Sequence, residues 1–329
     1  MQKPSSSDGD ASLPTLSKSQ KIAVLIPCYD EAAAIAAVVQ DFRRALPTAD
    51  VYVYDNNSRD ATVEEAQKAG AITRHETRQG KGFVVRRMFA DVEADIYIMV
   101  DGDGTYDAAS APRLVTTLIE RGLDMVNAAR AEPEVESAYR PGHKTGNMLL
   151  SRSVRMLFGE GFADMLSGYR VFSRRFVKTF PATSGGFEIE TELTIHALEL
   201  EIPFTEVATP FRERRAGSTS KLRTFHDGFR ILWMILKLTK RERPVHLFGS
   251  AAALFLVIAV TLMVPVMQTY LQTGLVPRFP TLIASLGLIT LSLVSLVSGL
   301  ILDTVTCGRR EVKRLAYLSQ SRFRSARME

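Results

Sequence analysis

The chain has 329 residues, of which 46% are hydrophobic, so it is long and apolar enough to bury a large core in one or two domains. Its two cysteines, Cys28 and Cys307, lie near opposite ends of the sequence, which argues against a disulfide framework and against a cysteine zinc site. Lys and Arg number 41 against 36 Asp and Glu, and this mild basic excess suits anionic ligands, nucleic acid or a membrane surface.

The first 130 residues contain a tail and then an alternating pattern. Residues 1–20 are rich in Ser, Asp and Pro and lack the apolar core of a signal peptide, so they predict a disordered tail. From residue 21, short apolar runs alternate with helical periodicity, which is typical of an α/β domain with a mainly parallel sheet. The predicted strands are residues 22–26, 50–54, 71–74 and 96–100, and the predicted helices are residues 31–45, 62–69 and 81–90.

The pattern is looser after residue 130. Helices are predicted at residues 145–158 and 188–199, and a strand is predicted at residues 205–209. Residues 222–238 predict a further helix with its apolar side chains on one face, which is either packed in the core or lies on a membrane surface.

Two long apolar stretches follow. Residues 244–277 and 279–302 contain no Asp, Glu, Lys or Arg, and a helix needs about 20 residues to cross a hydrocarbon core. We expect a transmembrane hairpin, with an unusually apolar core hairpin as the alternative. Basic residues flank the pair on both sides, whereas the connecting loop has only Arg278, so both termini and Cys28 are expected in the reducing cytoplasm.

Polar residues cluster where three predicted strands end, at residues 27–31, 55–60 and 101–107, and this edge of an open α/β sheet is where ligands bind. Asp101 and Asp103 are separated only by Gly102 after a buried strand, so a cation would relieve the repulsion between their charges. Their hard oxygen ligands suit Mg²⁺ or Mn²⁺. A solvated turn is the alternative for the spacing alone, but its position after an apolar strand favours a metal.

The other polar clusters are ambiguous when each is taken alone. Residues 55–58 have the composition of a turn, and Asp30 could cap a helix. Lys81, between two glycines, offers a cation on a flexible backbone that could approach a phosphate. The sequence has neither the Gly-x-x-x-x-Gly-Lys-Ser/Thr phosphate loop nor the Gly-x-Gly-x-x-Gly dinucleotide turn, which disfavours an NTPase or a dehydrogenase.

In their order along the chain, these segments resemble glycosyltransferase family 2, which has the GT-A fold. The matching motifs are Val-Leu-Ile-Pro-Cys-Tyr-Asp-Glu from Val24, Tyr-Asp-Asn-Asn-Ser-Arg-Asp-Ala-Thr from Tyr54, Gly-Lys-Gly from Gly80, Asp-Gly-Asp from Asp101, Asp-Met-Leu-Ser-Gly-Tyr-Arg from Asp164, and Arg-Arg-Ala-Gly from Arg214 with Ser220-Lys221. The resemblance covers about residues 21–238 and is closest to polyprenyl-phosphate glycosyltransferases of the dolichyl-phosphate mannose synthase type.

The resemblance implies a set of residues for the nucleotide-sugar donor. The nucleobase and ribose would be bordered by Pro27, Tyr29, Glu31, Asp55 and Asn57, with Lys81 near the phosphates and Asp101, Gly102 and Asp103 at the metal that bridges the diphosphate. Two positions depart from the family pattern. Asn56 stands where the family has a second acidic residue, and Thr105 stands where a Gln is frequent.

The resemblance also places the acceptor phosphate beside Arg130 and Arg140, and later Arg214 and Lys221. A lipid phosphate has a second pKa of about 6 and is already largely ionised near pH 7, so it needs cationic clamping more than a general base. Arg170 is a further candidate for that clamp. Asp164 lies where family members with hydroxyl acceptors carry a catalytic carboxylate, and it is either a base or a residue that orders Arg170 or the acceptor loop.

The remaining candidates are not expected to take part in catalysis or metal binding. Glu188, Glu190 and Glu192 are expected mainly as helix-start charges, which the helix dipole favours. His143, His196 and His226 show no metal-ligand spacing and are expected to be structural or exposed.

We therefore expect a membrane-bound inverting glycosyltransferase that uses Mg²⁺ or Mn²⁺ to move a sugar from a nucleotide sugar to polyprenyl phosphate on the cytoplasmic face. Its partners would be the donor, the lipid acceptor and the bilayer, without nucleic acid; a homo-oligomer is left open. The alternatives are a same-fold transferase acting on a lipid or glycan hydroxyl and a non-catalytic nucleotide-sugar-binding scaffold subunit. Trp233 forms no Gln-x-x-Arg-Trp element, which argues against a processive synthase.

The expected domains are a tail at 1–20, a catalytic domain at 21–221, an interfacial helix and basic flank at 222–243, two spans at 244–303 and a basic tail at 304–329.

Overall fold

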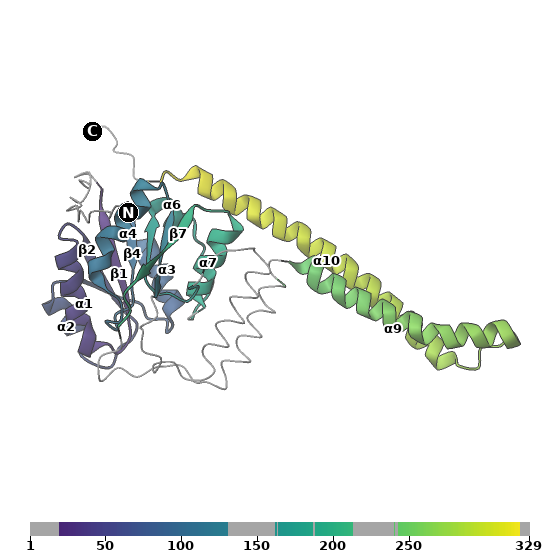
Figure 1. The fold of residues 1–329 in the computed structure, drawn as a ribbon. Coiled ribbons are helices and arrows are strands. Elements are labelled where there is room, and N and C mark those ends of the chain that lie inside the picture. The colour runs from purple at the N-terminus through teal and green to yellow at the C-terminus, as the bar shows by residue number, and fades with distance from the viewer. Residues whose placement is uncertain are drawn as a thin grey trace, which may run out of the picture. The chain divides into compact units, whose positions relative to one another are not determined.

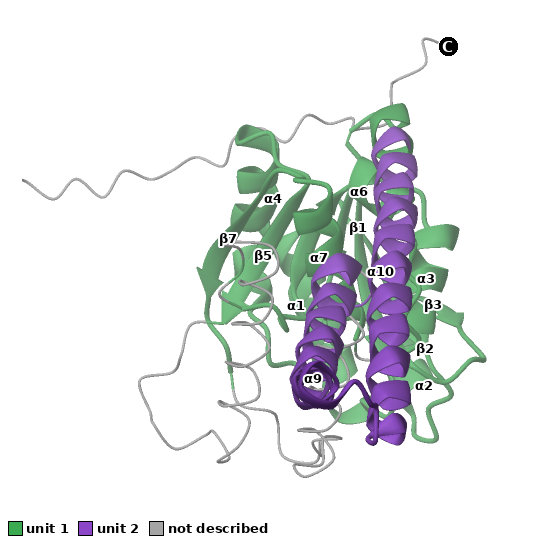
Figure 2. Cartoon of the chain, turned by 90° about the vertical axis from the view of Figure 1, so that its right-hand side faces the viewer, with its two compact units in different colours: residues 1–137, 162–220, 316–329 green, residues 138–161, 221–315 purple. Residues whose placement is uncertain are grey.

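The computed structural model describes residues 20–130, 162, 164–186, 188–212, 240 and 243–322. The chain divides into two compact units, which Figure 2 shows in green and purple. The first unit comprises residues 1–137, 162–220 and 316–329, and the second comprises residues 138–161 and 221–315.

The first unit is built on a seven-stranded sheet with the order β3-β2-β1-β4-β6-β5-β7. Its strands are β1 (Ile22–Cys28), β2 (Asp50–Asp55), β3 (Ile72–His75), β4 (Ile96–Met99), β5 (Met125–Arg130), β6 (Arg170–Ser173) and β7 (Phe204–Thr209). β6 runs antiparallel to both of its neighbours, β4 and β5, and every other pairing is parallel. The predicted mainly parallel sheet is therefore confirmed.

Helices cover both faces of this sheet (Figure 1). They are α1 (Ala32–Ala45), α2 (Thr62–Lys68), α3 (Lys81–Asp91), the short 3-10 helix η1 (Ala108–Ser110), α4 (Ala111–Glu120), α6 (Arg174–Thr179) and α7 (Ile189–Glu199). The residues of β1 alternate between the two faces, so Val24 and Ile26 join Ile35 of α1 and Leu114 of α4 in the main apolar core. On the other face α3 packs with α6 and α7.

The elements from β1 to β4, with α1, α2 and α3 between them, form where the sequence predicted them, as do α7 and β7. The sequence reasoning named no element for the residues that form α4, β5, β6 and α6. The predicted helices at 145–158 and 222–238 lie outside the described residues.

The topology brings the chemistry-bearing segments to one edge. β1, β2, β4, β5 and β7 run in the same direction and end at that edge, while the antiparallel β6 begins there. Residues that follow Cys28, Asp55 and Met99, and residues that precede Arg170, therefore meet at the carboxyl edge of the parallel strands.

The second unit contains α9 (Pro244–Thr273) and most of α10 (Phe279–Ser319). Both helices are long and apolar enough to cross a membrane, which confirms the two predicted apolar spans as helices. They pack together, because Ser292 and Ser295 of α10 donate hydrogen bonds of 2.8 and 2.9 Å to carbonyl oxygens of α9. Gly299 has no room for a Cβ atom beside Phe248, so the helices approach closely there.

Candidate active site

The loops after β1 and β2 hold each other in place. The amide of Asp30 donates to Ser58 Oγ at 2.9 Å, and the amide of Arg59 donates back to Asp30 Oδ1 at 2.7 Å. Glu31 and Ala32, at the start of α1, donate to Thr62 and Asp60 in the same manner. The segment that contains Pro27, Tyr29 and Glu31 is therefore fixed against the segment that contains Asp55 and Asn57, as a shared nucleotide site requires.

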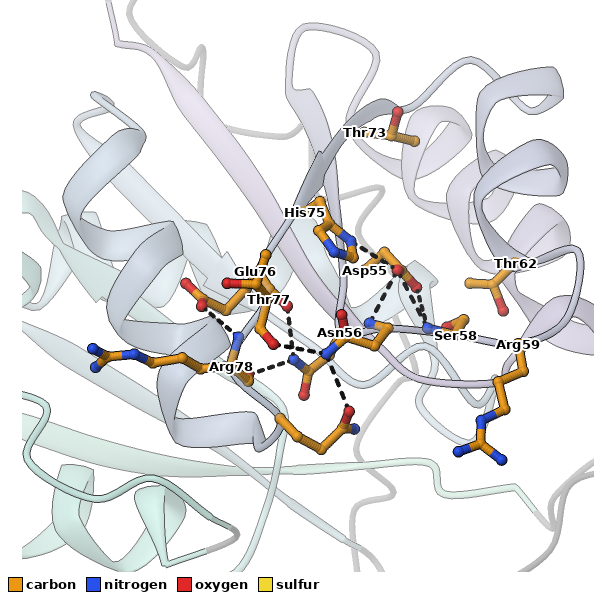
Figure 3. Close-up of polar contacts among 12 residues, drawn as sticks. Asp55, Asn56, Ser58, Arg59, Thr62, Thr73, His75, Glu76, Thr77 and Arg78 are labelled. Atoms are coloured by element: carbon orange, nitrogen blue, oxygen red, sulfur yellow. Dashed lines mark hydrogen bonds and ion pairs between the residues drawn. The ribbon is translucent and has the colours of Figure 1, made fainter.

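Asp55 is only 4% exposed and its carboxylate lies at the centre of a hydrogen-bonded turn (Figure 3). It accepts from the amides of Asn57 at 3.1 Å and of Ser58 at 3.2 Å, and it contacts Nδ1 of His75 at 3.1 Å. His75 ends the neighbouring strand β3, so the position of the Asp55 carboxylate is set by two adjacent strands.

Asn56, which replaces an acidic residue of the family pattern, joins β2 to the segment after β3 (Figure 3). Its Nδ2 donates to the carbonyls of Glu76 at 3.0 Å and Arg78 at 2.7 Å, and its Oδ1 accepts from the amide of Gly80 at 2.7 Å. An amide can donate and accept at once, whereas a carboxylate only accepts. The departure at this position therefore has a structural reason.

The glycines around Lys81 serve close packing of the backbone. A Cβ atom on Gly80 would overlap the carbonyl of Gly185, and one on Gly82 would overlap the carbonyl of Ser184. Gly80 also has a φ of +136°, which L side chains rarely adopt. The motif thus packs the start of α3 against the loop before α7 and aims the Lys81 side chain inward.

Lys81 lies between two carboxylates. Its Nζ is 2.5 Å from Asp101 Oδ1 and forms a second ion pair with Glu190 of α7. Burial by itself would lower the pKa of Lys81, but the charges of Asp101 and Glu190 outweigh it and raise the pKa well above its usual value. The ammonium group is therefore permanently charged and held beside the metal motif.

Asp101 and Asp103 follow β4 at the carboxyl edge of the sheet, as predicted. The Asp101 side chain is 30% exposed, and Asp103 is 5% exposed with Oδ1 accepting from the Thr105 hydroxyl at 2.7 Å. Thr105 thus orients Asp103 at the position where the family pattern frequently has Gln. Gly102 has no room for a Cβ atom because Cys28 Sγ lies against it.

The oxygen ligands fit Mg²⁺ or Mn²⁺ that is shared with a phosphate. Among the described residues, no group of three His, Cys, Asp or Glu side chains comes together that could hold a metal by itself. If Asp101 and Asp103 hold such an ion, phosphate oxygens and water would supply its remaining ligands, as is usual for Mg²⁺.

Arg130, at the carboxyl end of β5, forms a two-contact ion pair with Asp164. Nε of Arg130 is 2.7 Å from Oδ2 of Asp164, and Nη2 is 2.8 Å from Oδ1. Burial would raise the pKa of the Asp164 carboxyl, but the Arg130 guanidinium holds it below its usual value. Asp164 therefore orders Arg130 rather than Arg170, which the sequence had suggested as its partner.

Arg170 was predicted to belong to the acceptor clamp, but the structure places it in the interior. It is fully buried, and its guanidinium donates to the carbonyls of Ser167 at 3.0 Å and Met165 at 2.7 Å and to the Thr194 hydroxyl at 2.9 Å. Burial lowers its pKa to about 10, so it stays charged at neutral pH. Through these bonds, Arg170 stabilises the turn that precedes β6. Arg140, Arg214 and Lys221 lie outside the described residues.

Two glutamates that were expected mainly as helix-start charges lie in the first turn of α7, as expected, and both are also buried. Glu190 pairs with Lys81, and Glu192 accepts from the Ser184 amide at 2.8 Å and from Thr183. Burial raises the pKa of Glu190, whereas these hydrogen bonds lower the pKa of Glu192 against the effect of its burial. Their spacing at the start of α7 gave no signal for these contacts. His196 is buried against Phe176 and Phe180, which agrees with a structural role.

Comparisons with known proteins agree with this geometry. Residues 23–180 match the family described as Glycosyl transferase family 2. Glycosyltransferase AglJ of Haloferax volcanii is 36% identical over 230 residues, which cover 70% of this chain and 75% of that protein. The dolichyl-phosphate hexose transferase of the same organism is 30% identical over 222 residues, which cover 68% of this chain and 95% of that protein.

A solved structure shows the same fold. Glucosyl-3-phosphoglycerate synthase from Mycobacterium tuberculosis, in complex with Mn²⁺, UDP and glucosyl-3-phosphoglycerate, aligns with a TM-score of 0.55 and 22% identity. The alignment covers 68% of this chain and 80% of that chain, which confirms the expected GT-A-like architecture. From its motifs, its fold and its relatives, the chain belongs to glycosyltransferase family 2.

Proposed function

We propose that this enzyme transfers a sugar, with inversion at the anomeric carbon, from a nucleotide sugar to polyprenyl phosphate at the cytoplasmic face of a membrane. The observation that carries this proposal is the Arg130–Asp164 ion pair at the carboxyl end of β5. One relative that shares this chain's sequence over most of its own length is named for transfer to dolichyl phosphate, which supports the same class of acceptor.

The Arg130–Asp164 pair bears on the acceptor because a hydroxyl nucleophile must lose its proton, whereas an ionised phosphate need not. Asp164 has an exposure of 8%, both of its carboxylate oxygens contact Arg130, and its pKa is lowered. A carboxylate in this state is a weak base. The pair is better suited to presenting an oriented guanidinium to a phosphate oxygen.

On the donor side, the residues around Asp55 would hold the nucleoside and Asp101 and Asp103 would hold Mg²⁺ or Mn²⁺. The metal would supply charge stabilisation for the departing nucleoside diphosphate. Asp103 is held ready by Thr105, and Asp101 is held by Lys81.

In the proposed reaction, a phosphate oxygen of the acceptor forms a bond to the anomeric carbon. The bond from that carbon to the donor's diphosphate oxygen breaks, and the nucleoside diphosphate leaves with the electron pair. No proton changes place, so the protein has to orient the two phosphates and balance their charge. Arg130 would do so for the acceptor.

The two apolar helices support a lipid acceptor, since they would anchor the enzyme in the bilayer that contains it. The helices alone do not determine on which side of the membrane the first unit lies. The charges that flank them favour the cytoplasmic side.

The test compares two acidic residues with different proposed roles. Asp164→Asn should retain measurable transfer to polyprenyl phosphate, whereas Asp103→Ala should abolish it without loss of fold or membrane insertion. Membranes that contain the full chain would be incubated with a panel of labelled nucleotide sugars and with either polyprenyl phosphate or polyprenol. Asp91→Asn is the matched control, because Asp91 pairs with Arg87 on the surface of α3, away from the site.

Two results would contradict this function. If polyprenol serves as well as polyprenyl phosphate, or if Asp164→Asn is as inactive as Asp103→Ala, the hydroxyl-acceptor alternative is correct. If the wild-type chain binds nucleotide sugars but transfers none of them, the scaffold alternative is correct.

A second prediction concerns Arg130. Arg130→Ala should raise the KM for polyprenyl phosphate about ten- to a hundredfold, because it removes a charge-assisted contact and leaves the Asp164 charge without this partner. Binding of UDP or GDP, measured by calorimetry, should change much less. An equal loss of nucleotide and acceptor binding would assign Arg130 to overall folding instead.

A further inference from the structure

Lys81 is the centre of a buried charge cluster that the proposed reaction does not by itself explain. Three segments far apart in the sequence supply it: Lys81 begins α3, Asp101 follows β4, and Glu190 lies in the first turn of α7. The exposed fractions of the side chains are 11% for Lys81, 6% for Glu190 and 30% for Asp101. Glu190 is thus the interior partner, and Asp101 is the partner that faces the site.

Burial of a charge is unfavourable unless an opposite charge or hydrogen bonds compensate it. Lys81 is compensated by Asp101 and Glu190 together, because its ammonium group pairs with both carboxyl groups. Glu190 therefore shares the Lys81 ammonium group with Asp101 and restrains its position beside Asp101.

The same contacts restrict where Asp101 points. Its Oδ1 is held by Lys81 at 2.5 Å, and its carboxylate lies against the backbone of Gly168, where a Cβ atom would overlap it. Gly168 is fixed in turn, because its amide donates to the Tyr106 hydroxyl at 2.8 Å. Asp101 is thus held from two sides, by the Lys81 ammonium group and by the backbone of Gly168.

A helix-dipole role alone does not account for Glu190. A first-turn carboxylate interacts favourably with the dipole without any partner from another element, whereas Glu190 is buried and pairs with Lys81 of α3. Glu192 lies two residues further along the same helix, is similarly buried, and bonds to Thr183 and Ser184 instead. The two glutamates therefore provide a comparison within one helix.

We infer that Glu190 is a positioning residue that acts through Lys81: it holds the Asp101 carboxylate in the orientation in which Asp101 binds the divalent cation. This inference rests on the metal site of the proposed function, but not on the identity of the acceptor.

The first measurement is the affinity for Mn²⁺, read from the electron paramagnetic resonance signal of unbound Mn²⁺ with the full chain in detergent, alone and with UDP or GDP. Glu190→Gln keeps the size of the side chain and removes its charge. It should weaken Mn²⁺ binding about 10- to 100-fold, as changes to residues that orient a metal ligand do. Raising the Mn²⁺ concentration should restore transfer by Glu190→Gln, and the KM for polyprenyl phosphate should stay unchanged.

The matched control is Glu192→Gln. It should lower the midpoint of thermal unfolding, because the amides of Thr183 and Ser184 lose a charged acceptor, and it should leave Mn²⁺ affinity at the wild-type value. A second control uses Lys81→Met. If Glu190 acts through Lys81, adding Glu190→Gln to Lys81→Met should change Mn²⁺ affinity by clearly less than it does in the wild type.

Wild-type Mn²⁺ affinity in a folded Glu190→Gln chain would overturn the inference, as would an equal effect of Glu190→Gln with and without Lys81. Should Glu190→Gln not fold, Glu190→Asp, which keeps the charge but shortens its reach, must show the same loss and the same rescue by Mn²⁺. A wild-type chain that binds no Mn²⁺ with UDP or GDP would overturn the metal site as well. Preference for polyprenol over polyprenyl phosphate would overturn the proposed acceptor and leave the Mn²⁺ result standing.

Discussion

At the scale of single residues, Asn56 shows how a departure from a family pattern can have a local structural cause. The amide side chain is 4% exposed and makes three hydrogen bonds that tie β2 to the segment before α3. Two of these bonds need a donor, which the family's acidic residue does not have when ionised. This end of β2 is therefore shaped by the hydrogen bonds of the Asn56 side chain.

This reasoning predicts the effect of restoring the acidic residue. In Asn56→Asp, the carbonyls of Glu76 and Arg78 lose their donor and face a negative charge, which should cost about 1–3 kcal/mol for each carbonyl left without a partner. The midpoint of thermal unfolding should fall accordingly. Asn57→Asp is the control, because the amide of Asn57 bonds to Thr77 and Gln79 at exposed positions. An Asn56→Asp chain as stable as Asn57→Asp would refute this account.

The site residues also show what sequence could and could not predict. Asp101 and Asp103 were predicted because they follow an apolar strand whose end lies at the ligand-binding edge of the sheet, whereas Asp55 was predicted from the family resemblance. The partners of Lys81 and Asp164 were not predictable, because these contacts join segments whose order in space only the completed sheet determines. Arg170 was assigned to the acceptor clamp because an acceptor phosphate needs cations, and its complete burial was not expected because arginines are rarely fully buried.

At the scale of elements, the sequence patterns predicted β1 to β4 and β7, of which β3 and β7 include polar residues, and missed β5 and β6. β6 is four residues long and includes Arg170 and Ser173, so it has no apolar run to detect. The length of α10 was also underestimated. Charged residues end the apolar stretch after residue 302, but they do not end the helix, which continues to Ser319.

The last residues of α10 belong to the first unit, where they complete a buried cluster around Asp124. Asp124 precedes β5, at the edge opposite the candidate site, and its carboxylate contacts Ser173, Arg175 and the Tyr317 hydroxyl. Arg322 adds two hydrogen bonds of 2.7 Å to carbonyls that surround the end of α4. The C-terminal segment is therefore part of the structure of the catalytic unit.

We expect Tyr317→Phe to destabilise this unit. The change removes a hydrogen bond to a fully buried carboxylate, and hydrogen bonds to charged groups contribute about 1.5–3 kcal/mol. The thermal unfolding midpoint of the purified chain should fall, while transfer activity well below that midpoint should be unchanged. Leu318→Ala is the neighbouring control, since Leu318 is 66% exposed. A midpoint equal to that of Leu318→Ala would show that the Tyr317 hydroxyl adds nothing.

At the scale of the whole molecule, the chain combines a sugar-transfer fold with two helices whose apolar side chains are largely exposed. Such exposed apolar surface is unfavourable in water and favourable in a bilayer. Ser and Thr hydroxyls within these helices bond to backbone carbonyls of the same helix or of its neighbour, as polar groups in hydrocarbon must. Both features agree with a membrane anchor and leave its orientation to be tested.

The orientation follows from the charges that flank the two helices. Basic residues lie before α9 and after the apolar part of α10, whereas the connecting loop carries only Arg278, so the loop should face away from the cytoplasm.

The test uses intact cells that produce variants of this chain, in each of which the introduced cysteine is the only one besides Cys28. A membrane-impermeant maleimide should label Thr273→Cys and should not label Ser5→Cys. Cys307 must be changed to Ser for these variants because it is exposed, whereas Cys28 is buried and should not react. The wild-type chain, which keeps Cys307, provides a separate control. Cys307 follows the second apolar stretch and should react only after the membrane is made permeable. Labelling of Ser5→Cys or Cys307 from outside, with protection of Thr273→Cys, would place the sugar donor site on the opposite face.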